Sequence, residues 1–305
     1  MATEVVEAGD PVILYFSITC VVLLPSIEHG GVTHNAWGLF NHSDIIGKPF
    51  GGKVYPSMKS ENPRPLHVLR VTPELFTLSI PHRTQIIYHS DISSIISGLD
   101  LLPGSLVAEA GTGSASLAFS IANSISQNGH LYTFDIDNDR VAHNMKLLSL
   151  VTIPGLVSIE QRDVIKDGFP LTLNVDALFL DLPSPWLVVH HAKAALKENG
   201  RICTFSPAIE QVMKNVEALS KEGFHQIRTI EVMLKPWGLD MQKDSGNKRK
   251  RFDADFQKCA SSFQLPMRGH TSYLTFAVKG LLDELNHPKP RLSVRNVRRM
   301  MDSTD

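Results

Sequence analysis

The sequence predicts an α/β protein in which a parallel sheet, covered by helices on both faces, follows a small all-β domain. Residues 1 to about 70 are rich in glycine and β-branched residues, and their apolar runs break at Pro25, Gly30 and Gly47. From Ser90 onward, apolar runs of strand length alternate with segments of helical period, which is typical of a parallel sheet. The 305 residues suit a main domain with a smaller one.

The smaller predicted domain covers residues 1–72. Its longest apolar stretch, at 12–24, is shorter than the roughly 20 residues of a membrane-spanning helix, and its β-branched residues favour strands. The chain is then punctuated by prolines, at Pro63, Pro65, Pro73 and Pro81. We therefore place a linker at residues 73–89.

The main domain is expected at residues 90–279, and its first helix, over 91–99, has Ser90 or Asp91 as the predicted N-cap. We then expect strands at 105–110, 130–135, 157–161, 177–182 and 201–205, and helices at 114–126, 139–150, 186–197 and 209–222. Two last strands, at 226–234 and 272–278, are separated by about 37 residues that we expect to be largely unstructured. Within them we expect a flexible basic insertion at 236–264, and we expect a flexible basic tail at 280–305.

The formal net charge of -1 averages two unlike parts of the chain. Segments 243–251 and 289–299 hold 10 of the 30 Lys and Arg residues and a single acidic residue, Asp244. The remainder therefore carries 20 basic and 30 acidic side chains. The charge pattern predicts an acidic body with two basic segments, and such a body is poorly suited to gripping RNA alone.

The cysteines and the N-terminal charges bear on compartment. Three scattered cysteines without a C-x-x-C pair argue against a disulfide framework and a cysteine-based zinc site, and we predict no metal. No Lys or Arg precedes Lys48, so neither a secretory nor a mitochondrial leader fits. The basic run at 248–251 can be a nuclear import signal, an RNA patch or a solvated loop. We expect an intracellular protein of the nucleus with no membrane partner.

Residues 107–117 predict a strand, a glycine-rich turn and a helix start, where open α/β sheets bind nucleotides. Gly111 and Gly113 let the backbone approach a ligand. The dinucleotide fingerprint needs a third glycine where Ser116 stands, which argues against NAD. Glu109 places an acidic group beside the turn, which suits an ammonium group and not a pyrophosphate.

Acidic residues also end the next two strands. Asp135 can accept hydrogen bonds from both ribose hydroxyls, and Asp163 can meet an adenine amino group. With Glu109, they outline a site for a ribosyl adenine that bears a cation, which describes S-adenosylmethionine better than any phosphate ligand. The alternative is that each aspartate only caps a helix after its strand, which is a weaker explanation for the whole set.

A fourth acidic residue, Asp181, ends the next buried strand. Pro183 and Pro185 remove backbone donors and stiffen the following loop, so we expect Asp181 to be held at the pocket. In amino-methyltransferases an acidic or amide residue at this position contacts the nitrogen to be methylated. Trp186 either stacks on a base or packs its ring on the sheet, and both interpretations stay open.

At this point the chain resembles a known family, the catalytic subunits of tRNA (adenine(58)-N1)-methyltransferase. The blocks that carry the resemblance lie in order along most of the chain, at 43–51, 71–75, 81–88, 109–114, 179–186, 205–211 and 269–276. Pro-His-Arg-Thr-Gln at 81–85 and Asp-Leu-Pro-Ser-Pro-Trp at 181–186 are specific to this family rather than to methyltransferases in general.

The resemblance implies a barrel-like N-terminal domain joined to a Rossmann-like class I methyltransferase domain, with S-adenosylmethionine as cofactor and N1 of adenine 58 in tRNA as target. It makes Asp181 the catalytic residue. The resemblance implies cofactor contacts by Gln85, Gly113, Ser114 and Ser116 at the methionine end, Asp135 and Arg140 at the ribose, and Asp163 and Val164 at the adenine. Through Gln85, the linker at 73–89 contributes to this site. Glu109, Gly111 and Asp181 complete the predicted cofactor site.

The resemblance has two mild departures and one implication for partners. Asp135 stands where Glu is common, and Ala115 stands where Gly is frequent; we expect Ala115 to be harmless because it lies in a helix start. The family works as a heterotetramer with a related non-catalytic subunit that helps bind tRNA, which fits the acidic body. Two rival hypotheses are a non-enzymatic RNA-binding or scaffold subunit and a methyltransferase that acts on proteins or small molecules.

Overall fold

The computed structural model describes residues 4–17, 19–35, 37–57, 63–80, 85–126, 128–233, 237–241, 259–263 and 272–280. Both basic segments, the tail after Gly280 and residues 81–84 of the family-specific block lie outside this part of the chain. Among the described helices, none combines the length and the apolar character that crossing a membrane requires. The described side chains also contain no cluster of three or more His, Cys, Asp or Glu residues suited to a metal ion.

The N-terminal domain consists of two small antiparallel sheets over one apolar core, which confirms the predicted all-β domain. The larger sheet has the order β2-β1-β6-β5, with β1 at Val12–Ser17, β2 at Cys20–Leu24, β5 at Lys53–Val54 and β6 at Leu66–Leu69. The smaller pairs β3 (Val32–Asn35) with β4 (Gly38–Asn41), which leads into the 3-10 turn η1 (His42–Asp44). Phe16 of β1 and Phe40 of β4 meet edge to face in the shared core.

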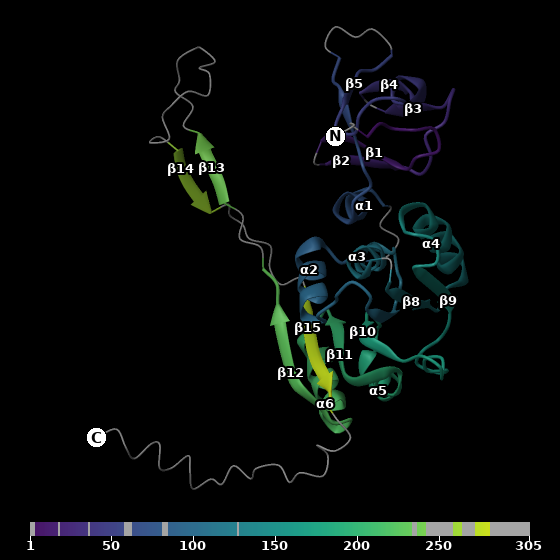
Figure 1. Cartoon of the computed structure of the whole chain (residues 1–305). Helices are drawn as coiled ribbons and strands as arrows, with labels where there is room; N and C mark the ends of the chain where they lie inside the picture. The colour runs from purple at the N-terminus through teal and green to yellow at the C-terminus, as the bar shows by residue number, and fades with distance from the viewer. Residues whose placement is uncertain are drawn as a thin grey trace.

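The predicted linker contains a helix, α1 (Pro73–Ser79), that the sequence reading missed. Pro73 occupies the first turn, where its missing N–H costs nothing, and the Thr72 hydroxyl accepts a hydrogen bond from the Leu75 N–H. Pro73, one of the four prolines that suggested a linker, therefore begins a helix. In Figure 1, α1 lies between the N-terminal domain and the main domain, and it contacts β1, β2 and α3.

The main domain has the predicted sheet with helices on both faces. The sheet has the order β12-β15-β11-β10-β7-β8-β9. Its strands are β7 (Leu106–Ala110), β8 (His130–Asp135), β9 (Val157–Gln161), β10 (Val175–Leu180), β11 (Leu196–Ser206), β12 (Phe224–Glu231) and β15 (Tyr273–Lys279). One face packs on α2 (His89–Gly98), α3 (Ser116–Ile125) and α4 (Asn138–Val151), and the other on α5 (Val189–Ala195) and α6 (Ile209–Lys221). Neighbouring strands from β11 to β9 are parallel, whereas β15 runs antiparallel to both its neighbours.

Two predicted boundaries in this domain were wrong. Helix α2 begins at His89, with Tyr88 at the N-cap and no side-chain cap. The predicted cap Asp91 is instead buried and accepts a hydrogen bond from the hydroxyl of Ser272, the residue before β15. The single helix predicted at 186–197 is instead the 3-10 turn η2 (Pro185–Leu187) followed by α5, and β11 already begins at Leu196.

The insertion between β12 and β15 was expected to be largely unstructured, which is wrong for part of it. Strand β13 (Trp237–Met241) pairs antiparallel with β14 (Cys259–Phe263), so that Trp237 lies opposite Phe263 and Met241 opposite Cys259. Figure 1 shows this hairpin standing clear of both the N-terminal domain and the main sheet. The large sequence separation of its strands concealed the pairing from local reading.

Candidate active site

The glycine-rich turn after β7 lies directly against the loop after β10. The two strands are parallel neighbours, so their carboxyl ends meet at one edge of the sheet. Gly111 has a φ of +96°, and a Cβ atom there would lie 2.1 Å from the main-chain oxygen of Asp181. Only glycine permits this approach. The turn and Asp181 therefore form one continuous wall.

The next glycine of the turn is held from two sides. Gly113 donates its N–H to Asp135 Oδ2 at 3.1 Å and accepts a hydrogen bond at its carbonyl from Asn144 Nδ2 at 2.9 Å. Asn144 is buried on α4. A single asparagine inside a helix carries no sequence signal, so this role was not predicted.

Ala115, which precedes α3, contradicts the expectation that glycine is not needed there. Its φ of +63° and ψ of +14° lie in the left-handed region, which costs an L-residue roughly 1–2 kcal/mol. The residue is fully buried, and its carbonyl accepts from the Phe119 N–H. The prediction placed Ala115 inside the helix, but it is the residue just before α3. Alanine in place of the frequent glycine therefore strains the backbone of the turn.

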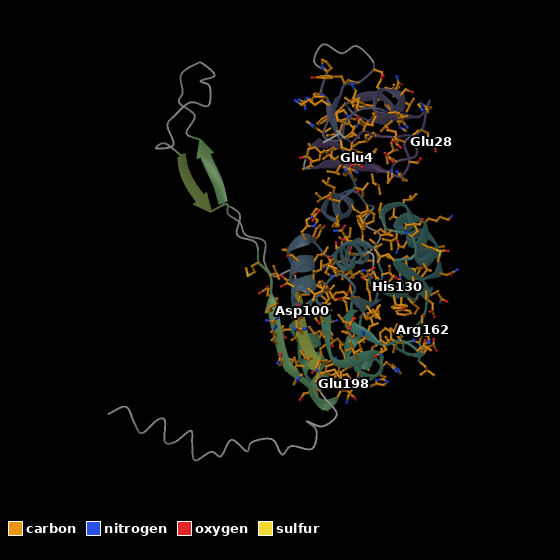
Figure 2. The ribbon with its side chains drawn as sticks, in the orientation of Figure 1. Glu4, Glu28, Asp100, His130, Arg162 and Glu198 are labelled. Carbon is orange, nitrogen blue, oxygen red and sulfur yellow. The ribbon has the colours of Figure 1, made fainter. Side chains whose placement is uncertain are left out.

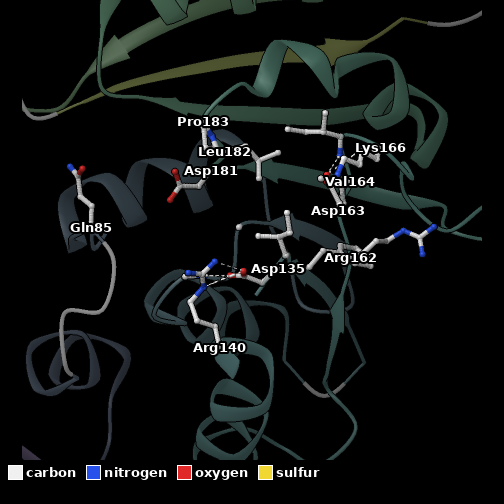
Figure 3. A pocket seen from close by; sticks show the side chains of 15 residues that line it. Gln85, Asp135, Arg140, Arg162, Asp163, Val164, Lys166, Asp181, Leu182 and Pro183 are labelled. Atoms are coloured by element: carbon white, nitrogen blue, oxygen red, sulfur yellow. Dashed lines mark hydrogen bonds and ion pairs between the residues drawn. The ribbon is translucent and has the colours of Figure 1, made fainter. Parts of the chain in front are cut away.

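Asp135 forms an ion pair at the end of β8. Its Oδ1 lies 2.7 Å from Nη2 of Arg140, and Nε of Arg140 is 3.2 Å from both carboxylate oxygens (Figure 3). The N-cap of α4 is Asp137, which accepts from the N–H groups of Asp139 and Arg140. The alternative that Asp135 only caps the following helix is therefore wrong.

Asp163 combines a local structural role with a place at the cavity. Its Oδ1 accepts hydrogen bonds from the N–H groups of Ile165 at 3.1 Å and Lys166 at 3.3 Å, so it does stabilise the turn after β9. Its Oδ2 lies 3.4 Å from the Lys166 ammonium. The buried side chain of Val164 lies beside it and lines the cavity.

These groups surround a cavity of about 530 Å³ at the carboxyl edge of the sheet. Of the residues predicted from the sequence, its lining contains Gln85, Gly111, Gly113, Asp135, Arg140, Asp163, Val164 and Asp181. A smaller recess beside it is lined by Glu109, Ser114 and Ser116, and shares Gln85, Gly111, Gly113 and Asp181. In Figure 3, Asp181 lies between Gln85 and the Asp163–Val164 end. The structure thus brings every predicted site residue to one of two adjoining hollows.

Glu109 lies beside the turn, as the sequence suggested, but its side chain is fully buried. Its Oε2 accepts from the Thr133 hydroxyl at 2.7 Å, and Thr133 lies 2.7 Å from the Thr112 hydroxyl. Burial raises the pKa of Glu109 to about 8, with smaller contributions from the carboxylates of Asp181 and Asp135. The Glu109 carboxyl is therefore mostly protonated at neutral pH until a cation joins it.

Hydrogen bonds to the main chain hold Asp181 and the loop that follows it in place. Its N–H donates to the Ala110 carbonyl at 2.9 Å, and Gln211 of α6 donates from Nε2 to the Pro183 carbonyl at 3.3 Å. Burial raises the pKa of the Asp181 carboxyl to about 6, so it is mostly ionised at neutral pH. The neighbouring Trp186 ring lies beneath the Lys214 ammonium, 4.7 Å from the ring centroid, which favours packing on α6 over base stacking.

Comparison with known proteins identifies relatives of one kind. The family described as "tRNA methyltransferase complex GCD14 subunit" matches residues 65–250. A tRNA (adenine(58)-N(1))-methyltransferase catalytic subunit of Cryptococcus neoformans is 41% identical over 237 residues, which cover 75% of this chain and 53% of that protein. The chain therefore spans about half the length of that relative. Catalytic subunits of the same name from Dictyostelium discoideum and Candida albicans are 36% and 32% identical, and the alignments cover 77% and 96% of their lengths and 79% and 90% of this chain.

Solved structures support the fold. A SAM-dependent O-methyltransferase of Thermotoga maritima superimposes with a TM-score of 0.75 at 24% identity, covering 92% of this chain and 97% of the other. A tRNA (m1A58) methyltransferase of Aquifex aeolicus gives 0.67 at 22% identity, covering 90% and 99%. Both resemblances show a class I methyltransferase fold for this chain.

Replacing Gly111 with alanine is expected to disrupt both hollows. The new Cβ would strike the Asp181 main chain, in addition to the strain of the positive φ. Gly155→Ala is the matched control, because Gly155 has a φ of +81° but open space around a Cβ. Urea unfolding should show a cost of about 1 kcal/mol for Gly155→Ala and at least twice that for Gly111→Ala. Equal costs would show that the close approach is unimportant.

The raised pKa of Glu109 predicts a loss of stability with rising pH. The folded-state pKa of about 8 exceeds the usual 4.5, so the unfolded chain releases its proton first, and stability declines between these values. From about pH 6.5 to 8, where Asp181 is already ionised, wild type should lose on the order of 1–2 kcal/mol relative to Glu109→Gln. Urea unfolding at both pH values measures the difference, with Glu210→Gln as the exposed control. Parallel pH profiles for wild type and Glu109→Gln would contradict the assignment.

Proposed function

We propose that this chain, which belongs to the family of tRNA methyltransferase complex GCD14 subunits, transfers a methyl group from S-adenosylmethionine to N1 of adenine 58 in tRNA. The observation that carries this proposal is the position of Asp181. This carboxylate ends β10 beside the glycine turn, in the block at 181–186 that is specific to the catalytic subunits. The mapping of methylated nucleosides after incubation with tRNA tests the proposal and separates it from methylation of proteins or small molecules.

The two hollows fit the proposed methyl donor. S-adenosylmethionine supplies a methyl group on a positively charged sulfur when it is bound. The smaller recess is lined by Ser114, Ser116 and Leu117 at the start of α3, and the first turn of a helix favours a carboxylate such as that of methionine. Glu109 and Asp181 border the same recess and favour a cation.

The larger cavity fits the nucleoside part. Gly113, Asp137 and Arg140 already donate to the Asp135 carboxylate, so ribose hydroxyls can bind it by replacing Arg140 contacts. At the other end, the side chain of Val164 offers an apolar surface to an adenine ring, and Asp163 Oδ2 offers an acceptor for its amino group. The described lining of the smaller recess contains no Lys or Arg, which argues against a nucleotide phosphate there.

Asp181 is the residue that we assign to catalysis. Adenine N1 has an in-plane lone pair and needs no strong base, so the protein must mainly align the ring and stabilise the positive charge that forms on it. The ionised Asp181 can accept a hydrogen bond from the exocyclic amino group and stabilise that charge. Because the cavity lies at the strand ends and is partly enclosed, a base paired within tRNA must be extruded to reach it.

The charge distribution supports a partner subunit. Figure 2 labels the exposed carboxylates Glu28, Asp100 and Glu198 on the outside of the acidic body. Asp100 and Glu198 pair with Arg201 and Lys279, but the 30 acidic side chains outside the two basic segments exceed the 20 basic ones, and this excess would repel RNA phosphates. The β13–β14 hairpin provides the contact for this partner, because an isolated two-stranded hairpin is only marginally stable in water and gains from packing on another chain. We propose a heterotetramer with a related non-catalytic tRNA-binding subunit, located in the nucleus.

Asp181→Ala is expected to retain S-adenosylmethionine binding and to lose tRNA methylation by about 10²- to 10³-fold. Mass spectrometry of digested tRNA measures the product, and calorimetry measures cofactor binding.

Wild-type activity should rise with pH through about 6 as Asp181 ionises, and Asp181→Asn should lack this rise. Glu210→Ala, on an exposed position of α6, serves as the control. Near wild-type turnover by Asp181→Ala would overturn the catalytic assignment.

The purified chain alone is expected to methylate tRNA poorly and to gain activity when its partner subunit is present. The physical reason is that the acidic body cannot neutralise enough phosphates by itself. Activity of the chain alone is compared with that of the complex isolated from cells through a tag on this chain. Full activity of the single subunit would refute the need for a partner, and failure of S-adenosylmethionine to bind would favour a non-enzymatic scaffold.

A further inference from the structure

Two buried hydroxyls join the helix below the N-terminal domain to the glycine turn. Thr77 lies on α1 with no exposed surface, and Ser116, the first residue of α3, is 4% exposed. Their oxygen atoms are 2.7 Å apart. Thr77 Oγ1 is also 2.9 Å from the Pro73 carbonyl, and Ser116 Oγ is 3.2 Å from the Ile87 carbonyl. The pair is thus the centre of a buried polar chain.

The hydroxyl protons of this buried polar chain cannot satisfy all of its contacts at once. Two hydroxyls supply two protons, whereas three contacts need one each. If Thr77 donates to Ser116, then Ser116 can donate to the Ile87 carbonyl. If Thr77 donates to Pro73, then Ser116 can donate to Thr77 and leaves Ile87 without that donor. Ser116 therefore keeps hydrogen bonds with both Thr77 and Ile87 only when Thr77 is the donor between the two hydroxyls.

The segment that Ser116 holds contributes to the smaller recess. Gln85, Ile86 and Ile87 line this recess together with Ser116. Ile86 and Ile87 are buried, whereas Gln85 is exposed at the cavity. A hydrogen bond to the Ile87 carbonyl therefore fixes the wall that faces the glycine turn.

We propose that Thr77 is a positioning residue for the methyl-donor site, acting through Ser116 on the 85–87 wall. The inference rests on the proposed function for the identity of the ligand. Thr77 contacts neither hollow, so its influence must pass through the Ser116 hydroxyl. Helix α1 itself stays docked without this bond, because Phe76 packs edge to face on Phe119 of α3 with ring centroids 5.0 Å apart.

The expected effect is on affinity as well as on stability. Without the Thr77 hydroxyl, Ser116 keeps its own proton for the Ile87 carbonyl, but its oxygen loses the donor that fixes its position. The bond to Ile87 is then weaker, and the 85–87 wall populates arrangements that do not match the ligand. Apparent affinity then falls by the fraction of molecules that remain competent. For one buried hydrogen bond we expect S-adenosylmethionine to bind about 3- to 10-fold more weakly.

The test compares three variants of the full chain by calorimetric titration with S-adenosylmethionine, well below the lowest melting temperature. Thr77→Val removes the hydroxyl and keeps the shape, whereas Thr77→Ser keeps the hydroxyl and should restore wild-type affinity. Thr72→Val is the matched control, because it removes the N-cap of the same helix without touching Ser116. It should lower the melting temperature and leave affinity unchanged. If Thr77→Val does not fold, Thr77→Ala removes the hydroxyl without adding a methyl group beside Ser116.

The outcomes separate this inference from the proposed function. The positioning role is supported if Thr77→Val or Thr77→Ala binds S-adenosylmethionine more weakly while Thr77→Ser and Thr72→Val bind it with wild-type affinity. Unchanged affinity in the hydroxyl-free variants, with wild type binding normally, overturns the positioning role alone. An equal loss in Thr72→Val also overturns it, because helix stability would then be the cause. A wild-type chain that fails to bind S-adenosylmethionine sinks the proposed function and this inference together.

Discussion

The close contact between Gly111 and the main chain of Asp181 is the constraint on which the site depends. It exists because β7 and β10 are parallel neighbours, and because a residue without a side chain stands where the two strands end. The contact brings the glycine turn and the loop that begins at Asp181, which are far apart in the sequence, side by side. Asp135 and Asn144 then fix the next glycine of the turn, so that the position of Asp181 is transmitted to the start of α3.

The features that could be predicted from the sequence are those with a local signal. Strand and helix periods gave the alternating architecture, and position at the strand ends marked Asp135, Asp163 and Asp181. The missed features depend on contacts between distant residues. Asn144 and Thr133 are ordinary members of a helix and a strand, and their roles arise only when the fold places them beside the turn. The β13–β14 pairing and the left-handed Ala115 were missed for the same reason.

Similar side chains in this site exist in different electrostatic states. Asp135 is neutralised by Arg140, Asp181 is an ionised carboxylate with a raised pKa, and Glu109 is mostly protonated because burial raises its pKa further. A count of acidic residues would suggest a strongly negative cavity. In the larger cavity, however, Asp135, Asp163 and Asp181 are matched by Arg140, Arg162 and Lys166, and the buried Glu109 carboxyl of the smaller recess can become ionised when a cation enters. Such a site suits a single sulfonium or ammonium group better than a highly charged ligand.

The polar chain from Thr77 to Ile87 changes how the N-terminal domain relates to the active site. Helix α1 contacts β1 and β2 on one side and α3 on the other. The apolar contact of Phe76 with Phe119 gives this junction its strength, whereas the Thr77 hydroxyl gives it direction. The apolar contact depends little on the exact orientation of α1, so by itself it would keep the two domains together without fixing their orientation. A hydrogen bond depends on orientation, because Ser116 can donate its proton either to Ile87 or to Thr77, and a small rotation of α1 would change which of the two acceptors is better placed.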